Sequence, residues 1–396
     1  MLVHSYKSGR GRLARSAHGI SKRGARGIAA VILSAVVVVS AAACSSGTPA
    51  SASSSGASAA NVDAAKAAIA PFSGAPTTFP VTDPLPTVPF PSGKTFVFLQ
   101  CSTPVCAQVA KAFTAAVTAL GATPTIVSAG ATAQTAQAAA SSVIALKPDA
   151  VIISGNDPAL YGGALQTLSA AGTKVVSIQV NKDVSQYGIT FNYLGTDLSA
   201  QNGKVLADWV IANKGADANV VLYTLPVLDL SAHVQQAFTD EMTANCPSCT
   251  VRSVPIDVAT IGTTAPRTIV TDLQANPDTN TAVFVSYQTA TGLPAALTAA
   301  GLSPTTVGFA PTAGNLQDIK DGKLTAGLAI DFPVSIWTAV DAAARLVEGG
   351  QPVAGETSGE VPEQILEQKD ITFDPTQGWS GYPDYASKFT TLWQGK

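Results

Sequence analysis

Four cysteines in two close pairs are the residues of this 396-residue chain whose types and spacing most directly suggest chemistry. Cys101 and Cys106 lie in the stretch QCSTPVC, and Cys246 and Cys249 form a CxxC motif. Four cysteine thiolates could bind one zinc ion, and a CxxC motif could take part in redox exchange. In an exported protein the same pairs would form two structural disulfides. The choice depends on the compartment and on the position of each pair in the fold.

The N-terminal residues indicate export. Residues 1–27 contain seven Lys and Arg and no acid, and the apolar run GIAAVILSAVVVVSAAAC follows. This order is typical of a secretory signal peptide, which we expect to span residues 1–43. The end of the run resembles a bacterial lipobox, so we predict that Cys44 is lipidated and anchors the protein to the outer face of the cell membrane. Ordinary secretion without a lipid is the alternative.

Charge and motif content narrow the partners and activities. Beyond the leader the chain keeps 16 of its 23 Lys and Arg but all 26 Asp and Glu, which is a formal charge of −10. Such a surface repels phosphates, so we exclude nucleic acid as a partner. His233 is the one histidine after the leader, and the sequence contains no G-x-S-x-G, no H-E-x-x-H and no P-loop lysine spacing. We therefore expect no enzymatic activity, no metal and no cofactor, and a secreted hydrolase is the least favoured class.

The segment after the leader differs in composition from the rest of the chain. Residues 44–60 are a Ser/Ala-rich stretch that predicts a disordered tether. Residues 61–93 predict a short helix followed by a strap, because residues 71–92 contain seven prolines. Three phenylalanines in this part need burial, so we expect the strap to lie against the globular body: Phe72, Phe79 and Phe90.

From Lys94 onward, short apolar runs alternate with helical patterns. In residues 105–120, for example, Val109, Phe113, Val117 and Leu120 recur with helical spacing before Gly121. The strand-like runs are almost entirely apolar, as expected for parallel sheets that are buried on both faces. The alternation restarts near residue 199, so we predict an α/β protein with two doubly wound parallel-sheet lobes. The helices predicted from the pattern are 105–120, 132–146, 158–171, 199–214, 231–245, 266–275, 294–300, 316–322 and 336–348.

Residues 147–181, KPDAVIISGNDPALYGGALQTLSAAGTKVVSIQVN, resemble the sugar-type (ribose/galactose-like) solute-binding proteins of ABC importers. YLGTD (193–197), VGF (307–309) and DGKLTAGL (321–328) follow in the order that this family uses. The resemblance covers roughly residues 94–366, and the lipobox and tether resemble an actinobacterial lipoprotein subgroup. It implies the type I periplasmic binding protein fold, in which the chain crosses a hinge three times.

The resemblance also implies domain boundaries. We expect a first lobe at 94–196 plus about 332–362, and a second lobe at 197–331 plus about 363–370. The crossings would lie near Thr196, Asp331 and Pro362, and residues 371–396 would form a docked tail. In this arrangement Cys101 and Cys106 follow the first strand of one lobe, whereas Cys246 and Cys249 precede a strand of the other. That separation favours two disulfides, Cys101–Cys106 and Cys246–Cys249, over a shared metal.

Ligand contacts are expected where the carboxyl ends of the strands face each other across the cleft. The residues that we predict to bind ligand are Ser102, Thr103, Val105, Gln179, Asn181, Asp229, Tyr287, Gln288 and Asp331, with Phe191 and Phe332 as further candidates. For Asp331, hinge hydrogen bonding and ligand contact are both open. The charged sugar contacts of the family are mostly absent, since Gln179-Val180 replaces Asp-Arg and Ala310 replaces Asp. A short ring closed by Cys101 and Cys106 would pre-order the first of these loops.

Together these features predict an extracytoplasmic solute-binding lipoprotein of an ABC importer. It would capture a small sugar or sugar-like solute in a closing cleft and deliver it to the permease subunits in the membrane. We expect a monomer. A ligand sensor of the same fold, which signals to a membrane receptor, is the alternative.

Overall fold

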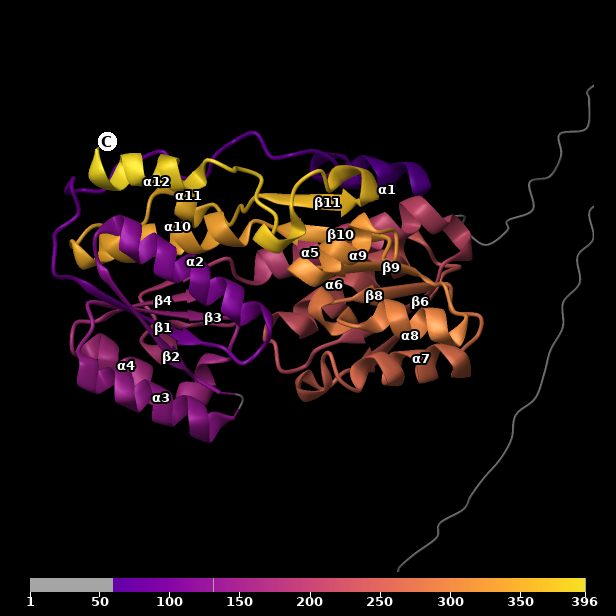
Figure 1. Cartoon of the computed structure of the whole chain (residues 1–396), viewed down its shortest axis with the longest axis horizontal. Helices are drawn as coiled ribbons and strands as arrows, with labels where there is room; N and C mark the ends of the chain where they lie inside the picture. Colours follow the sequence, from indigo (N-terminus) through magenta and orange to yellow (C-terminus); the bar gives the residue numbers. More distant parts are fainter. Residues whose placement is uncertain (1–59, 131, 396) are drawn as a thin grey trace, which may run out of the picture. The chain divides into compact units, whose positions relative to one another are not determined.

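The computed structural model describes residues 60–130 and 132–395. The predicted signal peptide, Cys44 and residues 44–59 of the predicted tether lie outside the described residues. Two sheets form the framework of the described part (Figure 1). The first sheet has the strand order β2-β1-β3-β4-β5, and all its neighbouring strands pair in parallel. Its strands are β1 (Thr95–Gln100), β2 (Thr123–Ser128), β3 (Ala150–Ser154), β4 (Lys174–Ile178) and β5 (Phe191–Tyr193).

The helices after these strands follow the predicted pattern closely. Helix α2 spans Val105–Leu120, buries Val109, Phe113 and Leu120, and ends at Gly121, which adopts a left-handed conformation with φ 88°. The predicted helix 158–171 is instead divided into a 3-10 turn and α4, because Gly162 takes a positive φ of 57° between them. Helix α3 spans Ala133–Leu146, and α4 spans Ala164–Ala170.

The second sheet has the order β11-β10-β9-β8-β6-β7. Its pairs are parallel, as predicted, apart from the edge pair of β10 with β11, which is antiparallel. Its strands are β6 (Asn219–Thr224), β7 (Thr250–Pro255), β8 (Thr281–Phe284), β9 (Thr305–Phe309), β10 (Ala326–Ile330) and β11 (Glu363–Glu367).

Close helix packing marks the second lobe. Gly203 on α5 allows α6 to approach, because a Cβ at this position would lie 2.5 Å from the Val234 carbonyl oxygen. The helices of this lobe are α5 (Thr196–Lys214), α6 (Leu230–Asn245), α7 (Ala265–Ala275), α8 (Leu293–Ala300) and α9 (Ala313–Lys320). Short 3-10 turns link elements of both lobes at Ala70–Phe72, Pro158–Tyr161, Ser185–Tyr187, Gly215–Asp217, Val258–Thr260, Tyr287–Ala290, Gln368–Asp370 and Pro375–Gln377.

The chain passes between the two sheets at three central points. It leaves the first sheet after β5 and enters α5, which packs on α6. It returns after β10 through α10 (Phe332–Val347), which packs on α2 and on strands β3 and β4. After α11 (Ala354–Thr357) it goes back as β11. These three crossings form the hinge.

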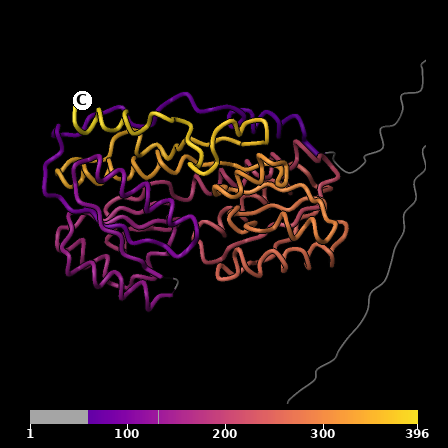
Figure 2. Tube along the Cα trace, viewed as in Figure 1, coloured from indigo at the N-terminus to yellow at the C-terminus, as the bar shows by residue number. Residues whose placement is uncertain are grey.

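The two terminal segments lie along the same edge of the described structure (Figure 2). Helix α1 (Val62–Ile69) packs on α5, and residues 73–94 contain no helix or strand. Helix α12 (Tyr385–Gln394) packs on α2 and α10. The sequence pattern missed α11, α12, β5 and β11. The strap buries Phe90, and its other two phenylalanines pack against the core while partly exposed.

Candidate functional site: the facing strand ends of the two lobes

Asp229, which begins α6 after strand β6, joins the second lobe to the first. Its Oδ2 accepts a hydrogen bond of 2.6 Å from the Asn181 backbone N–H, which follows β4. Its own backbone N–H donates to the Gly155 carbonyl at 3.5 Å, and Lys182 Nζ lies 3.6 Å from its Oδ1. Loops after two first-sheet strands therefore meet one residue of the second lobe, where the carboxyl ends of parallel strands converge.

The loop of the Cys101–Cys106 disulfide makes a second connection. Its Cα atoms are 5.6 Å apart, and α2 starts within the ring at Val105. The Val105 backbone N–H donates to Gln288 Oε1 at 3.3 Å. Gln288 is almost fully buried, and its Nε2 donates to Ser286 Oγ at 3.0 Å. Both sides of this contact are thus held in place from within their own lobes.

Three amide side chains lie in the first-lobe loops that follow β3 and β4. Asn181 Nδ2 donates to the Gln179 carbonyl at 3.2 Å, and Gln179 takes a positive φ of 57°. Asn181 Oδ1 is buried and has no hydrogen-bond partner among the described protein atoms. Asn156 Nδ2 donates to the Tyr161 hydroxyl at 3.0 Å, and burial raises the pKa of Tyr161 to about 12. Uncharged amides and backbone N–H groups are suited to hydroxyl groups, which both donate and accept.

All nine predicted ligand residues follow a strand of one of the two sheets, but the side chains of Tyr287 and Asp331 are engaged in the second-lobe core and in the hinge, which leaves seven. They are Ser102, Thr103, Val105, Gln179, Asn181, Asp229 and Gln288. Ser102 is exposed, whereas Thr103 is buried and its Oγ1 lies 3.0 Å from Cys106 Sγ. Their contact with a ligand remains a prediction, but the structure brings their loops together.

Tyr287 requires a correction, because its side chain lies in the core of the second lobe and not in the cleft. Its ring is fully buried and stacks on Phe284 with centroids 5.4 Å apart. Its hydroxyl contacts Thr306 Oγ1 at 3.1 Å, and burial raises its pKa. The sequence placed it correctly after β8, but the 3-10 turn that starts there directs the aromatic ring inward and leaves the next residue, Gln288, for the cleft contact.

Asp331 lies in the hinge, and its carboxylate is already engaged. Oδ1 accepts from the Val334 N–H at 3.0 Å and so caps α10. Oδ2 accepts from Ser380 Oγ at 2.7 Å and from the Gly381 N–H at 2.8 Å. Burial raises its pKa to about 6 against these hydrogen bonds. Of the two roles left open by the sequence, the geometry favours hinge hydrogen bonding.

Three further residues in these loops were not predicted as site residues. Asn156 and Asp157 lie in SGNDP, directly before the predicted helix 158–171. Asp157 caps the 3-10 turn that follows, and the Ala159 N–H donates to its Oδ1 at 2.9 Å. Lys182 Nζ lies 2.6 Å from Asp157 Oδ2, and this hydrogen bond raises the lysine pKa. Their signal was position alone, since each follows a buried strand at its carboxyl end.

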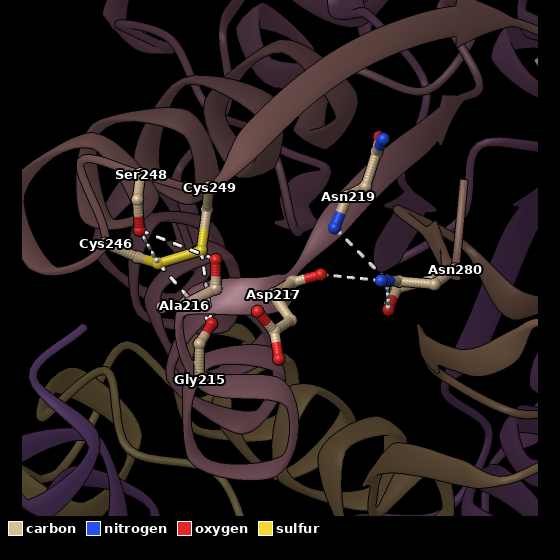
Figure 3. Close-up of a disulfide and its surroundings, with 9 residues drawn as sticks. Gly215, Ala216, Asp217, Asn219, Cys246, Ser248, Cys249 and Asn280 are labelled. Carbon is tan, nitrogen blue, oxygen red and sulfur yellow. Dashed lines mark hydrogen bonds between the residues drawn. A yellow bond between two sulfur atoms is a disulfide. The ribbon is translucent and has the colours of Figure 1, made fainter. Parts of the chain in front are cut away.

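The second cysteine pair lies at the opposite end of α6 from Asp229, just before the amino end of β7. Cys246 and Cys249 form a disulfide that closes the turn between α6 and that strand (Figure 3). Both sulfurs face the Gly215 carbonyl oxygen, at 3.5 and 3.3 Å. Within the described residues no three His, Cys, Asp or Glu side chains gather as metal ligands would. Both cysteine pairs are therefore disulfides of separate lobes in this structure.

The family follows from comparison with known proteins. Residues 95–351 match the family described as periplasmic binding protein domain. The chain belongs to this family. Its two-lobe α/β architecture is the type I periplasmic binding protein fold, and members of the family are extracytoplasmic solute-binding proteins, not enzymes. No curated protein sequence matches the chain.

Several solved structures share the fold. A solute-binding protein of an ABC transporter from Agrobacterium vitis with bound allitol has a TM-score of 0.61 and 20% identity, covering 71% of this chain and 98% of that one. A Caulobacter myo-inositol binding protein gives 0.61 and 21%, with 71% and 96% covered. A putative LacI transcriptional regulator from Bacteroides fragilis gives 0.62 and 16%, with 70% and 98% covered.

None of the helices in the described part of this periplasmic binding protein has the length and apolarity needed to cross a bilayer. The family match ends at residue 351 and begins at residue 95. The strap with α1, and the segment from β11 to α12, therefore lie outside it.

Proposed function

We propose that this protein is the solute-binding lipoprotein of an ABC importer. It captures a small sugar or sugar-like organic solute between its lobes and delivers it to the membrane permease, while a lipid on Cys44 keeps it at the outer face of the cell membrane. The observation that carries this proposal is the meeting of polar groups from both lobes at the strand ends. Asn181 N–H reaches Asp229, and Val105 N–H reaches Gln288.

The groups around these contacts define the ligand that the cleft would accept. Amides and backbone N–H groups outnumber charges there, and the carboxylate of Asp229 is shared with Lys182 and a backbone N–H. A hydroxylated, uncharged solute would satisfy such groups without leaving a buried charge unpaired. The buried, unpartnered Oδ1 of Asn181 is an acceptor for one hydroxyl.

A closing cleft gives the protein its signal. A ligand that contacts both lobes favours the closed arrangement by its differential affinity, and a permease recognises that arrangement. The three hinge crossings allow rotation of one lobe against the other without unfolding either sheet.

A thermal-shift screen tests the proposal. Sugars, polyols, nucleosides and aromatic acids are each added to the purified protein. A true ligand at 100 times its Kd should stabilise the protein by about 2.7 kcal/mol. Gln179→Ala and Asn181→Ala should abolish the shift, whereas Tyr287→Phe should retain it because that ring lies in the core. A shift from another ligand class and from no sugar or polyol would overturn the sugar assignment.

A sensor is the second candidate, because the putative LacI transcriptional regulator from Bacteroides fragilis has the same fold. Transport assays separate the two roles. Deletion of the gene should abolish uptake of the identified ligand if the protein serves an importer. Retained uptake with a lost transcriptional response would favour the sensor.

A further inference from the structure

Both terminal segments outside the family match connect one lobe to the other; we call residues 60–94 and 371–395 the terminal brace. The N-terminal part starts on the second lobe, where the Asn61 N–H donates to the Asn245 carbonyl at 2.8 Å and α1 packs on α5. It ends on the first lobe, where the Phe90 ring meets Phe96 of β1 at 6.2 Å. Arg345 of α10 holds the strap between these points by donating to the Pro84 carbonyl at 3.0 Å.

The C-terminal part follows the same route. Ile371 and Trp379 are buried in the core of the second lobe, and Lys320 of α9 donates to the Phe373 carbonyl at 2.9 Å. Beyond residue 384 the chain forms α12 on the first lobe. There Trp393 stacks on Trp337 of α10 with ring centroids 5.1 Å apart. The brace therefore adds two crossings to the three of the hinge.

The two parts of the brace are bonded to each other, as their side-by-side course in Figure 2 suggests. The Leu85 N–H donates to the Leu392 carbonyl at 3.2 Å, and the Phe90 N–H donates to the Trp393 carbonyl at 3.1 Å. The Tyr382 hydroxyl also donates to the Thr78 carbonyl. They would move as one body because separating them would leave backbone groups unpaired.

Asp331 joins this body to the hinge. Its backbone N–H donates to the Pro362 carbonyl at 2.9 Å, which links the second and third crossings. Its Oδ2 holds Ser380 and Gly381, where the C-terminal segment passes from one lobe to the other. At that point the backbone is packed tightly, since a Cβ on Gly381 would lie 2.3 Å from Pro76 of the strap. We propose that Asp331 is a positioning residue that fastens the terminal brace to the hinge and thereby limits opening of the cleft.

The physical argument is geometric. Asp331 lies at the second crossing, so opening would change the backbone there, and a segment held to its carboxylate would have to move with it or separate from it. Charge-assisted hydrogen bonds to a fully buried carboxylate are among the strong ones. Without these hydrogen bonds, residues 380 and 381 are no longer held to Asp331, while the C-terminal segment stays packed on both lobes. The brace then resists opening less.

Hydrogen–deuterium exchange of the full chain without ligand tests this inference. The amides of Val105 and Asn181 donate across the cleft, so their exchange reports opening, whereas the amides of β3 report unfolding of the first sheet. Asp331→Asn keeps an oxygen to cap α10 but presents an NH₂ group to Ser380 and Gly381. We expect roughly tenfold faster exchange at the two cleft amides, a factor that corresponds to about 1.4 kcal/mol. Exchange in β3 should change by less than about twofold.

Two further variants protect the test. Ser380→Ala removes one bond to Asp331 and keeps the cap, so it should give a smaller increase at the same two amides and serves if the first variant folds poorly. Asp374 caps a turn in the same tail, where its Oδ1 accepts from the Thr376 N–H. Asp374→Asn alters this cap and should leave the exchange rates of the two cleft amides unchanged. Equal acceleration of cleft and β3 amides, or no acceleration, would overturn the inference. It rests on the proposed closing cleft, but because no ligand is used, its failure is distinguishable from a failed ligand screen.

Discussion

The two sides of the hinge are held together by different kinds of contact. On the cleft side the lobes meet through a few polar groups, of which Asp229 and Lys182 are partly exposed and Gln288 is buried. On the opposite side the brace is held by buried aromatic stacks and by an ionic cluster around Arg345, which is 3% exposed. Breaking an exposed polar contact costs little free energy because water replaces it, whereas breaking a buried ion pair is strongly destabilising. The difference suggests that the cleft is built to open and the brace side to stay closed.

The ionic cluster should produce the largest effect when it is broken. Arg345 Nε donates to Asp341 Oδ2 at 2.6 Å, and Glu356 Oε2 lies 3.7 Å away. Burial and the neighbouring Asp341 carboxyl raise the pKa of Glu356, so a neutral Glu356 leaves one cation paired with one anion. Arg345→Met leaves the buried Asp341 carboxylate without its cation and should lower the free energy of unfolding by about 3–5 kcal/mol.

Urea denaturation measures this loss. Lys323→Met is the matched control, since it removes a cation from an exposed pair with Asp321 and should change stability little. A loss no greater than that of the control would mean that the cluster is replaceable by packing, as some buried ionic groups are.

A buried carboxyl at the start of β11 should make stability depend on pH. Burial raises the pKa of Glu363 to about 8, although Gln201 donates to it at 3.1 Å. The folded state therefore keeps a proton that the unfolded chain releases at its ordinary pKa of 4.5. The free energy of unfolding should fall as pH rises from about 5 to 8, by roughly 3 kcal/mol in total.

Glu363→Gln should flatten this slope when urea unfolding is followed across the same pH range. Glu360→Gln, an exposed glutamate three residues earlier, is the control and should keep the slope. A slope that survives in Glu363→Gln would assign the dependence to another buried carboxyl, such as Asp208, whose pKa burial raises to about 7.

The two disulfides offer a direct comparison of cleft and periphery. Replacing either pair by serine should lower the free energy of unfolding by about 2 kcal/mol, because the unfolded chain regains the conformational entropy that a short disulfide loop removes. Only the Cys101→Ser/Cys106→Ser variant should also weaken ligand binding, because its ring positions the Val105 N–H opposite Gln288. Equal loss of affinity in the Cys246→Ser/Cys249→Ser variant, measured by calorimetry with the ligand found in the screen, would contradict this.

Sequence periodicity predicted the sheets' framework better than the links between them. The pattern gave α2 its observed bounds, because a buried stripe and a terminal glycine define a helix locally. It missed β11, because the glutamates at its two ends, Glu363 and Glu367, interrupt the apolar pattern of a buried strand. The pairing of β11 with β10 is not visible in the local sequence. It also missed α12, which is short and amphipathic and depends on packing against Trp337.

The sequence could predict which loops form the candidate site, but not which side chains in those loops make contact. Strand ends identify which loops face the cleft, so most of the predicted ligand residues lie in those loops. Which side chain of a loop points inward depends on the local backbone, as the adjacent residues Tyr287 and Gln288 show. Contacts between residues far apart in the chain, such as Val105 with Gln288 at a separation of 183, have no local signal.

The smallest effect should come from Asp229, and it distinguishes two roles for this residue. If it joins the lobes, Asp229→Asn should speed exchange at the Asn181 amide about fivefold without ligand, or about 1 kcal/mol, because the bond keeps an acceptor but loses its charge. Asp257→Asn, which alters a cap within the second lobe after β7, should leave that amide unchanged. If Asp229 instead binds the solute, exchange without ligand should stay the same while affinity falls. The contact of the Val105 N–H with Gln288 would then remain on the cleft side, and the brace side would hold the lobes together by many more protein contacts.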